Sequence, residues 1–233
     1  MADRIEHELT PEEIEQLKRI EDNKDALASL IEDLAGPGRR RRQLAAHVVA
    51  LLAEREPELL SPYVPQLLDA LERPEAQTRW EILDACTLLV GEHAKEIGAA
   101  FAAAEEALFD EDSAMLRLAA FRLLCAWGAT ERRRSEKVWP ILDEAIQCYH
   151  GDLEYRDMLA SLHAFATGKI DGRVAGELAG RLQFDAENGK GSYLRARSSE
   201  IFGLLVKRFK LENPQKRTRA VAKGEDDAED DEE

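Results

Sequence analysis

Apolar residues recur along this chain with the period of an α-helix, in blocks that each begin at an arginine. Arg41, Arg79, Arg117, Arg156 and Arg195 are separated by 38, 38, 39 and 39 residues. Side chains three, six, seven and ten positions after each arginine are mostly apolar, and these offsets form one stripe along a helix. The third and seventh positions are, in chain order, Leu44 and Val48, Ile82 and Cys86, Ala120 and Leu124, Leu159 and His163, and Ser198 and Phe202. The pattern predicts amphipathic helices whose apolar stripes form the core.

Another helical segment precedes each of these helices, across a short turn. The turns read GPG (36–38), RPEAQ (73–77), DEDS (110–113), HGD (150–152) and DAENGKG (185–191). They are rich in Gly, Pro, Asp and Asn, which end helices and form turns. The sequence therefore predicts an all-α fold, an α-solenoid of about five antiparallel helical hairpins over residues 25–210.

The repeat length, a proline early in two of the first helices and the arginine of the second helix resemble HEAT repeats, over roughly residues 25–209. This resemblance implies that the second helices line the concave side of the array. It also implies that the arginine bonds to an aspartate near the turn, forming a ladder along the stack. Asp112 precedes Arg117 in this way, whereas no aspartate precedes Arg79, so the expected ladder is incomplete. We expect a structural, capping role for the arginines rather than a ligand-binding one.

Both ends of the chain differ from the repeats. Thr10-Pro11-Glu12-Glu13 has the residues of a capping box, and an acidic helix with Ile14, Leu17 and Ile20 on one face follows it. We assign residues 1–24 to this helix, as a cap on the first repeat. Residues 211–233 are first basic and then acidic and contain almost no large apolar side chain, so we expect a disordered acidic tail.

The net charge of −15 comes from residues 1–35 and 225–233, because residues 36–224 carry 28 acids and 28 bases. A neutral body argues against a broad nucleic-acid footprint, which requires a basic surface. No apolar run approaches the roughly 20 residues of a membrane-spanning helix. The acidic start also lacks the apolar region of a secretory signal. We therefore expect a cytoplasmic protein with no membrane partner.

Side chains that commonly carry catalysis or bind metals are scattered in this sequence. Cys86, Cys125 and Cys148 lie far apart in apolar stretches, which predicts buried, reduced thiols. His47 and His163 fall on the apolar stripes, so we expect hydrogen-bonded core residues rather than metal ligands. The sequence contains no HExxH motif, no CxxC motif and no Gly-rich phosphate loop. We predict no catalytic residue, no metal site and no cofactor.

Positions one and five residues after each arginine face away from the apolar stripe. They are Arg42 and Ala46, Trp80 and Asp84, Leu118 and Arg122, Asp157 and Ser161, and Ala196 and Glu200. The HEAT resemblance places this row on the concave, partner-facing side. We therefore predict a non-enzymatic scaffold that binds a protein or peptide through Trp80, Asp84, Arg122, Asp157, Ser161 and Glu200. Trp80 either anchors the partner or seals the junction between two repeats.

A second hypothesis rests on the segment Trp80-Glu81-Ile82-Leu83-Asp84. It resembles a short segment of the HEAT-like bacterial alkylpurine DNA glycosylases, whose Trp and Asp, four residues apart, face the DNA. The resemblance implies a DNA-repair or DNA-binding solenoid. Those enzymes have a basic concave face, whereas the predicted row contains Asp84, Asp157 and Glu200. We therefore expect a protein or peptide partner rather than a nucleic acid.

Overall fold

The structure, a computed structural model, describes residues 9–21 and 23–211. Most of the predicted tail at 211–233, and residues 1–8 of the predicted cap, lie outside this range. The described residues are helices, turns and short connections, with no strand among them. They form two compact units, divided between Asp171 and Gly172.

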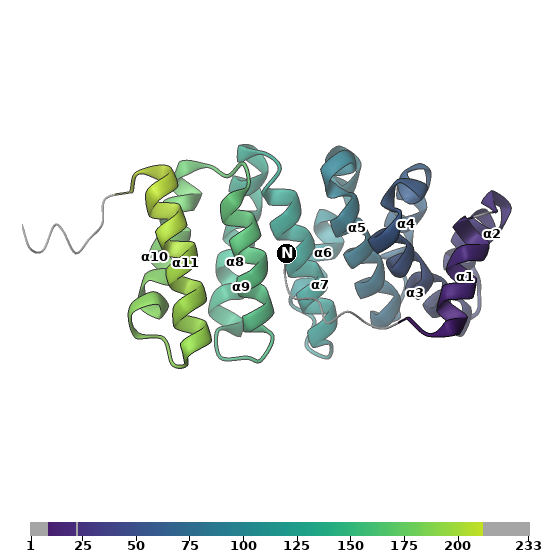
Figure 1. The fold of residues 1–233 in the computed structure, drawn as a ribbon, viewed down its shortest axis with the longest axis horizontal. Coiled ribbons are helices and arrows are strands. Elements are labelled where there is room, and N and C mark those ends of the chain that lie inside the picture. The colour runs from purple at the N-terminus through teal and green to yellow at the C-terminus, as the bar shows by residue number, and fades with distance from the viewer. Residues whose placement is uncertain (1–8, 22, 212–233) are drawn as a thin grey trace, which may run out of the picture. The chain divides into compact units, whose positions relative to one another are not determined.

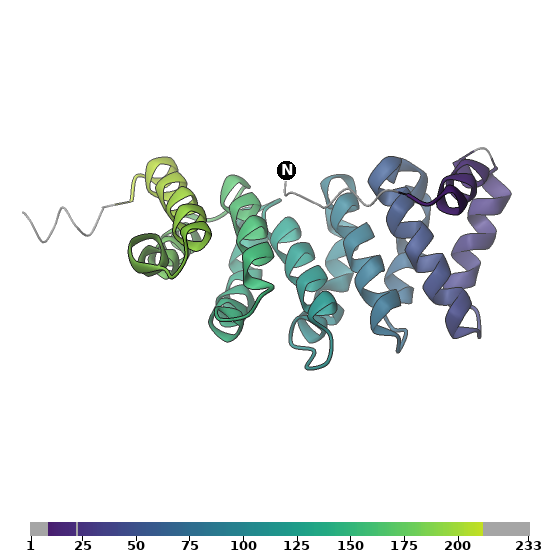
Figure 2. The ribbon, with the colours of Figure 1, turned by 60° about the horizontal axis from the view of Figure 1, so that its bottom comes forward.

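The first unit contains, within the described residues, a short helix followed by four helical hairpins. The short helix is α1 (Pro11–Glu21). The hairpins are α2 (Lys24–Ala35) with α3 (Arg39–Arg55), α4 (Val64–Ala70) with α5 (Ala76–Ile97), α6 (Phe101–Leu108) with α7 (Ala114–Gly128), and α8 (Arg132–Tyr149) with α9 (Tyr155–Thr167). Two 3-10 helices, η1 (Pro57–Tyr63) and η2 (Gly98–Ala100), precede α4 and α6. Figures 1 and 2 show these hairpins side by side in chain order.

The helices begin at residues that the sequence marks as caps. Thr10 and Glu13 form the predicted capping box, in which Thr10 N donates to Glu13 Oε2 at 2.7 Å and Glu13 N donates to Thr10 Oγ1 at 3.3 Å. The side chains of Asn23 and Ser113 accept bonds from backbone N–H groups in the first turns of α2 and α7. These bonds satisfy donors that a helix leaves unpaired at its start.

The second helices of neighbouring hairpins pack directly on one another, α3 on α5, α5 on α7 and α7 on α9. The predicted stripe supplies the core between them, with Ile82, Cys86, Leu124 and Leu159 all buried. Each hairpin thus shares its apolar face with the next one, as in a stacked repeat array. The predicted α-solenoid is confirmed.

The predicted register is wrong by one residue in the first repeat. Leu44, assigned to the apolar stripe, is exposed, and the buried residues of α3 include Ala45, Val49 and Leu52. Arg42 rather than Arg41 therefore begins this repeat, 37 residues before Arg79. Because residues 39–42 are all arginine, the repeat spacing alone could not show which of them begins the repeat.

Helix α1 covers one end of the first unit, where it packs on α2 and α3. Leu17 and Ile20 are buried there, whereas Ile14 remains exposed. Terminal helices with a polar outer face keep the apolar end of a repeat array from water. The capping role of α1 and the limits 1–24 and 25–210 stay predictions.

The second unit is one hairpin over its described residues, α10 (Gly172–Asn188) and α11 (Ser192–Phe209). The turn between them contains Gly191 at φ 97°, a backbone conformation that glycine adopts without steric cost. Leu178 of α10 and Leu205 of α11 are fully buried. The fifth predicted hairpin is therefore present, in a unit separate from the first four.

Candidate partner-binding surface

Arg42 is used by the fold rather than by a ligand. Its Nη1 donates to the carbonyl oxygen of Gly36 at 2.8 Å, in the turn before its own helix. Its Nε donates to Glu75 Oε2 at 3.1 Å, and its Nη2 also bonds to this carboxylate. Glu75 is the N-cap residue of α5 in the next repeat, and the bonds from Arg42 lower its pKa. Arg42 therefore links one turn to the next.

Arg117 repeats this arrangement two repeats later. Its Nη1 donates to the carbonyl oxygen of Asp110 at 2.8 Å, and its Nε and Nη2 donate to Glu154 Oε1 at 3.2 and 2.5 Å. Glu154 is the N-cap residue of α9, and the bonds from Arg117 lower its pKa. The prediction that Asp112 bonds to Arg117 is wrong, because the bonded acid, Glu154, belongs to the following repeat. The predicted structural role of Arg117 is confirmed.

One stripe of the second helices remains partly exposed once these arginines are assigned, although Glu81, Ala119, Met158 and Phe165 within it are buried. It consists of four positions, counted from the arginine that begins each repeat: the second before it and the second, fifth and ninth after it. Neighbouring positions in this set are three or four residues apart, so they share one face of the helix. At the fifth position these are His47 of α3, Asp84 of α5, Arg122 of α7 and Ser161 of α9. Since the second helices pack side by side, the stripes adjoin, and we call the area they form the second-helix surface.

Large apolar side chains lie exposed on this surface. Leu44 of α3 is 52% exposed, Leu88 of α5 is 42% exposed and Met115 of α7 is 49% exposed. Leu44 is the second residue after Arg42, Leu88 is the ninth after Arg79, and Met115 is the second before Arg117. All three therefore belong to the same stripe. None of the three was predicted at the surface, because the apolar pattern places Leu44 in the core, and Leu88 and Met115 lie outside the two positions of the predicted row.

Two predicted contact residues meet in the middle of the second-helix surface. Arg122 Nη1 donates to the two carboxylate oxygens of Asp84 at 3.3 and 3.4 Å. Their side chains are 26% and 15% exposed, respectively. This pair joins α5 to α7 and fixes one acid and one base where they still reach the solvent.

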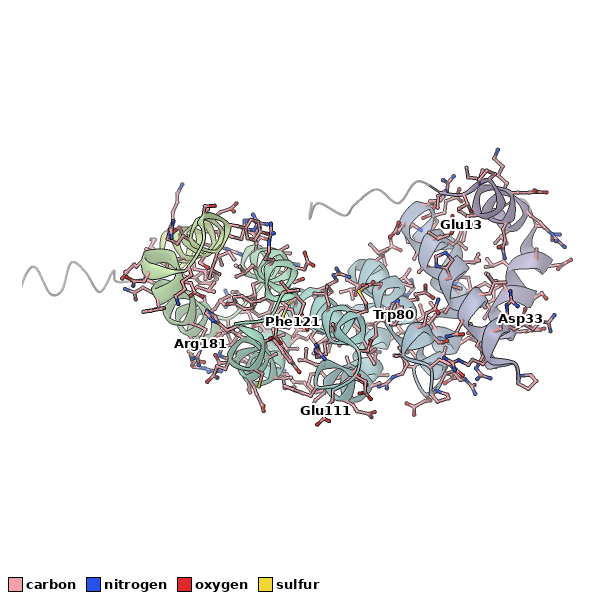
Figure 3. The ribbon with its side chains drawn as sticks, turned by 90° about the horizontal axis from the view of Figure 1, so that it is seen from below. Glu13, Asp33, Trp80, Glu111, Phe121 and Arg181 are labelled. Carbon is pink, nitrogen blue, oxygen red and sulfur yellow. The ribbon has the colours of Figure 1, made fainter. Side chains whose placement is uncertain are left out.

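The other predicted residues are placed differently. Trp80 lies half-buried one turn before Asp84 on α5, which Figure 3 shows with Trp80 labelled. Asp157 is exposed on α9, and the hydroxyl of half-buried Ser161 donates to its carbonyl oxygen at 3.5 Å. Glu200 belongs to the second unit, where it pairs with Arg197 at 2.6 Å.

Two of the positions predicted to face outward are buried. Ala46 of α3 is buried because the register of the first repeat is shifted, so His47 takes its place in the row. Leu118 of α7 is also buried. Trp80 and Asp84 are likewise more covered than the sequence suggested, which makes truncation of either one a perturbation of the fold as well.

His47 joins three helices that the sequence analysis did not connect. Its Nε2 lies 2.9 Å from Glu13 Oε1 of α1, and its Nδ1 lies 3.0 Å from Glu81 Oε1 of α5. Burial lowers the pKa of His47, but the bonds to the two carboxylates outweigh this effect and raise it. The bond from His47, together with the bonds from Thr10, lowers the pKa of Glu13 to about 2, whereas burial raises the pKa of Glu81. His47 and His163 are both half-buried, so their predicted core positions are wrong, although the predicted hydrogen bonding of His47 is confirmed.

The cysteines show little potential for nucleophilic chemistry. Cys86 and Cys125 are buried as predicted. Burial raises the pKa of Cys86 to about 12 and also raises that of Cys125, so neither thiol forms the reactive thiolate at neutral pH. Cys148 is exposed on α8, and its predicted burial is wrong.

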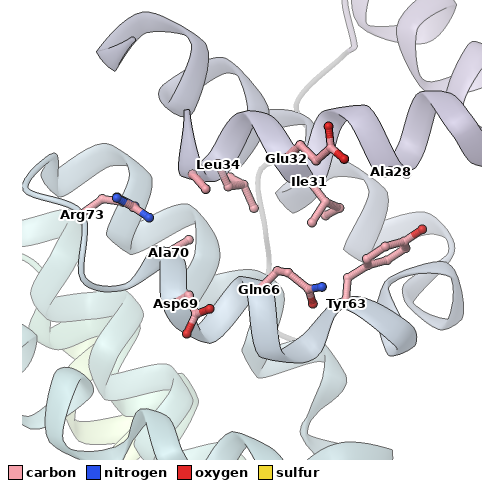
Figure 4. A pocket seen from close by; sticks show the side chains of 10 residues that line it. Ala28, Ile31, Glu32, Leu34, Tyr63, Gln66, Asp69, Ala70 and Arg73 are labelled. Atoms are coloured by element: carbon pink, nitrogen blue, oxygen red, sulfur yellow. The ribbon is translucent and has the colours of Figure 1, made fainter. Parts of the chain in front are cut away.

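A groove of about 300 Å³ lies between the first helices α2 and α4, apart from the second-helix surface (Figure 4). Its lining residues are Ala28, Ile31, Glu32, Leu34, Ala35, Tyr63, Gln66, Asp69, Ala70 and Arg73. Acids and a base share its rim.

Within residues 9–21 and 23–211, no group of three or more His, Cys, Asp or Glu side chains is arranged to hold a metal ion. No helix within this range has the length and apolarity needed to cross a membrane.

Comparison with known proteins relates this chain to others by fold alone. No protein-family model matches the sequence, and no curated protein matches it. A designed armadillo repeat protein in complex with the peptide (KR)4 is similar in structure, with a TM-score of 0.65, 14% identity, and coverage of 82% of this chain and 86% of that one. Computationally designed armadillo repeat proteins for modular peptide recognition give a TM-score of 0.61, 14% identity, and coverage of 82% and 86%. An engineered protein gives a TM-score of 0.62, 13% identity, and coverage of 82% and 83%. The chain has the α-solenoid fold of armadillo-like repeat proteins.

Proposed function

We propose that this chain is a non-enzymatic solenoid scaffold, acting in the cytoplasm, that binds a protein or peptide segment along its second-helix surface. The observation that carries this proposal is the shared stripe of Leu44, Leu88 and Met115, each more than two fifths exposed. Single exposed apolar residues are common, but several on the same face of successive helices offer contact points to a partner. These three lie on three successive second helices that pack side by side.

The polar groups of the same surface support a partner held in a defined orientation. The pair of Asp84 and Arg122 presents an acid and a base at fixed places between the apolar side chains. Fixed charges within an interface select the partner and its register more than they add affinity. Trp80 beside Asp84 adds a large, half-buried ring of the type that dominates many interfaces.

The fold also supports a peptide as the partner. The similar designed armadillo protein is described in complex with the peptide (KR)4, and a solenoid surface of this class is therefore compatible with peptide binding. We further propose that the repeats are of the two-helix HEAT type, because α2 with α3 and α8 with α9 form repeats of two helices alone. The 3-10 helices before α4 and α6 are additions to the second and third repeats, which there resemble the three-helix armadillo repeat.

The DNA-acting alternative receives less support from the surface. Asp84, the acid suggested by the glycosylase-like segment, is paired with Arg122. Along the fifth position of the first unit, the side chains are His47, Asp84, Arg122 and Ser161. This row contains both an acidic and a basic side chain, whereas binding of a phosphate backbone requires a row of basic side chains.

The test compares the surface with a matched control. Leu88→Asp with Met115→Asp places two charges on the second-helix surface, whereas Leu153→Asp places a charge on a 92% exposed turn residue outside it. The proteins and a wild-type control would be immobilised, incubated with lysate of the source cells, and analysed by quantitative mass spectrometry. We expect a partner that the wild type and Leu153→Asp retain equally and that the double variant loses about tenfold or more. Equal capture by all three proteins would refute the assigned surface.

The wild type and an Asp84→Asn variant distinguish the scaffold from a DNA-acting protein. Duplex DNA containing methylated purines would be incubated with the wild type, and released base would be measured against a no-protein control. Base release that Asp84→Asn abolishes would overturn the scaffold proposal. Binding that falls steeply between about 50 and 200 mM salt would likewise indicate contacts to nucleic-acid phosphates.

A further inference from the structure

Helix α1 is attached to the solenoid by few contacts. It has 11 residues, and helices this short are marginally stable unless they pack on other elements. Leu17 and Ile20 are its buried apolar side chains, while Ile14 on the same face is exposed. The Glu13 carboxylate adds a bond to His47 of α3 (Figure 3 labels Glu13). The apolar contact of Leu17 and Ile20 and the ionisable bond from Glu13 to His47 therefore help to hold α1 in place.

The bond partner of Glu13 is a member of the second-helix surface. His47 stands at the same repeat position as Asp84 and Arg122, and it is one turn from exposed Leu44. By binding His47, α1 occupies the end of this surface that the first repeat contributes. A segment that contacts His47 would therefore compete with α1 for this position.

We propose that α1 is a latch, which closes the first-repeat end of the second-helix surface and is released when His47 loses its proton. The existence of the latch stands on the geometry of α1, α3 and α5. Its effect on a partner rests on the proposed function.

The latch depends on protonation because both ring nitrogens of His47 face carboxylates. Glu13 lies 2.9 Å from Nε2 and Glu81 lies 3.0 Å from Nδ1, and they are the charged groups that face the ring from α1 and α5. Asp84, further along α5, raises the pKa of Glu81. Two bonds to ionised carboxylates require an N–H at each nitrogen, hence the imidazolium form. A neutral ring turns a lone pair toward one of the two carboxylates.

The contact that opens is the one to α1. Glu81 is held in α5, which packs on both α3 and α7, and the amide of Gln77 donates to the same carboxylate oxygen at 3.4 Å. Glu13 is held in α1, which has far less packing. Repulsion between a neutral His47 and the carboxylates is therefore relieved by movement of α1 rather than of α5.

The pH range follows from the directions of the two shifts. The pKa of His47 is raised in the folded protein, so its contribution to docking is complete below the usual value near 6.5 and is lost as pH rises through the raised value. The pKa of Glu13 falls from 4.5 to about 2, so its contribution is complete above 4.5 and is lost as pH falls toward 2. The latch is closed in weak acid and opens as pH rises through the raised pKa of His47.

Hydrogen exchange of the full-length protein tests the latch without a partner. Amide protection of residues 11–21, corrected for intrinsic exchange rates, would be measured by mass spectrometry between pH 5.5 and 8.5. We expect protection to fall with rising pH by up to about tenfold per pH unit, the limit for one proton, while α5 shows no such loss. Glu13→Gln should give low protection with little pH dependence. Glu15→Gln, an exposed position in the same helix, is the matched control and should behave as wild type.

Two results would overturn the latch: protection of α1 that does not change with pH in the wild type, or a Glu13→Gln protein that follows the wild-type profile. Neither depends on the partner, so loss of the proposed binding surface would leave this test intact. If the capture experiment identifies a partner, Glu13→Gln should bind it more tightly than Glu15→Gln at pH 6. Equal binding would restrict the latch to α1 docking and refute its effect on the surface.

Discussion

Replacing Arg117 by Gln tests whether the links between successive turns stabilise the array. The shorter, uncharged side chain would lose both bonds to Glu154 and the bond to the carbonyl oxygen of Asp110. The side chains of Arg117 and Glu154 are only 14% and 13% exposed. Exposed pairs contribute about 0–1 kcal/mol, whereas breaking a buried pair costs about 3–5 kcal/mol. A mostly covered pair at the rim of a turn falls between these limits, so we expect a loss of about 2 kcal/mol.

Arg79→Gln is the matched control, because Arg79 occupies the same position one repeat earlier. Its Nη2 reaches Glu106 at 3.4 Å, and the Glu106 side chain is 78% exposed. We expect this change to cost less than about 1 kcal/mol. Thermal and urea unfolding at pH 7, followed by circular dichroism, would measure both variants. A loss of about 2 kcal/mol corresponds to a fall in Tm of roughly 4–8 °C for a protein of this size.

The pH dependence gives a second measurement on the same proteins. Arg117 lowers the pKa of Glu154 below its usual 4.5, so the stabilisation is complete above 4.5 and is lost as pH falls through the lowered value. The difference between wild type and Arg117→Gln should therefore shrink as pH falls from 4.5 through the lowered pKa of Glu154. Equal destabilisation by Arg79→Gln and Arg117→Gln at pH 7, or a difference that grows as pH falls below 4.5, would refute the assigned role of this pair.

Three further predictions concern the core and the thiols. Leu124→Ala should destabilise the first unit by about 2–5 kcal/mol in urea unfolding, because the side chain is buried between repeats; an unchanged midpoint would contradict the register. Gly91→Ala should raise stability by roughly 0.5–1 kcal/mol, since nothing lies within 4 Å of its new Cβ, whereas Gly128→Ala places a Cβ 2.5 Å from a valine methyl group of α8 and should lower the Tm. A thiol reagent at pH 8 should modify Cys148 in the native protein and the two buried thiols only after denaturation; rapid modification of all three would show that the repeats open readily.

The sequence was sufficient to predict the helices and their pairing, because both depend on local features. Apolar spacing and turn residues lie within single repeats, and the hairpins fall close to their predicted turns. The first register failed because residues 39–42 are all arginine. Only the burial of Ala45 and exposure of Leu44 distinguish the two alternatives.

The side-chain links were harder to predict because each one joins different repeats. Glu154 lies 37 positions after Arg117, so a search for an acid near the same turn chose Asp112 instead. His47 is 34 positions from both Glu13 and Glu81. Periodicity places His47 on a helix face, but it does not show which neighbouring helices bring carboxylates to that face.

The side-chain links between successive repeats also determine how the first unit carries mechanical load. Arg42 with Glu75 joins the first repeat to the second, Asp84 with Arg122 joins the second to the third, and Arg117 with Glu154 joins the third to the fourth. These junctions lie in series, so a pulling force on the two ends of the unit acts on each of them in turn. We expect stepwise opening, in which each released repeat lengthens the chain by about 120 Å. The resistance of the solenoid to extension would then be determined by the junctions between repeats rather than by the helices themselves.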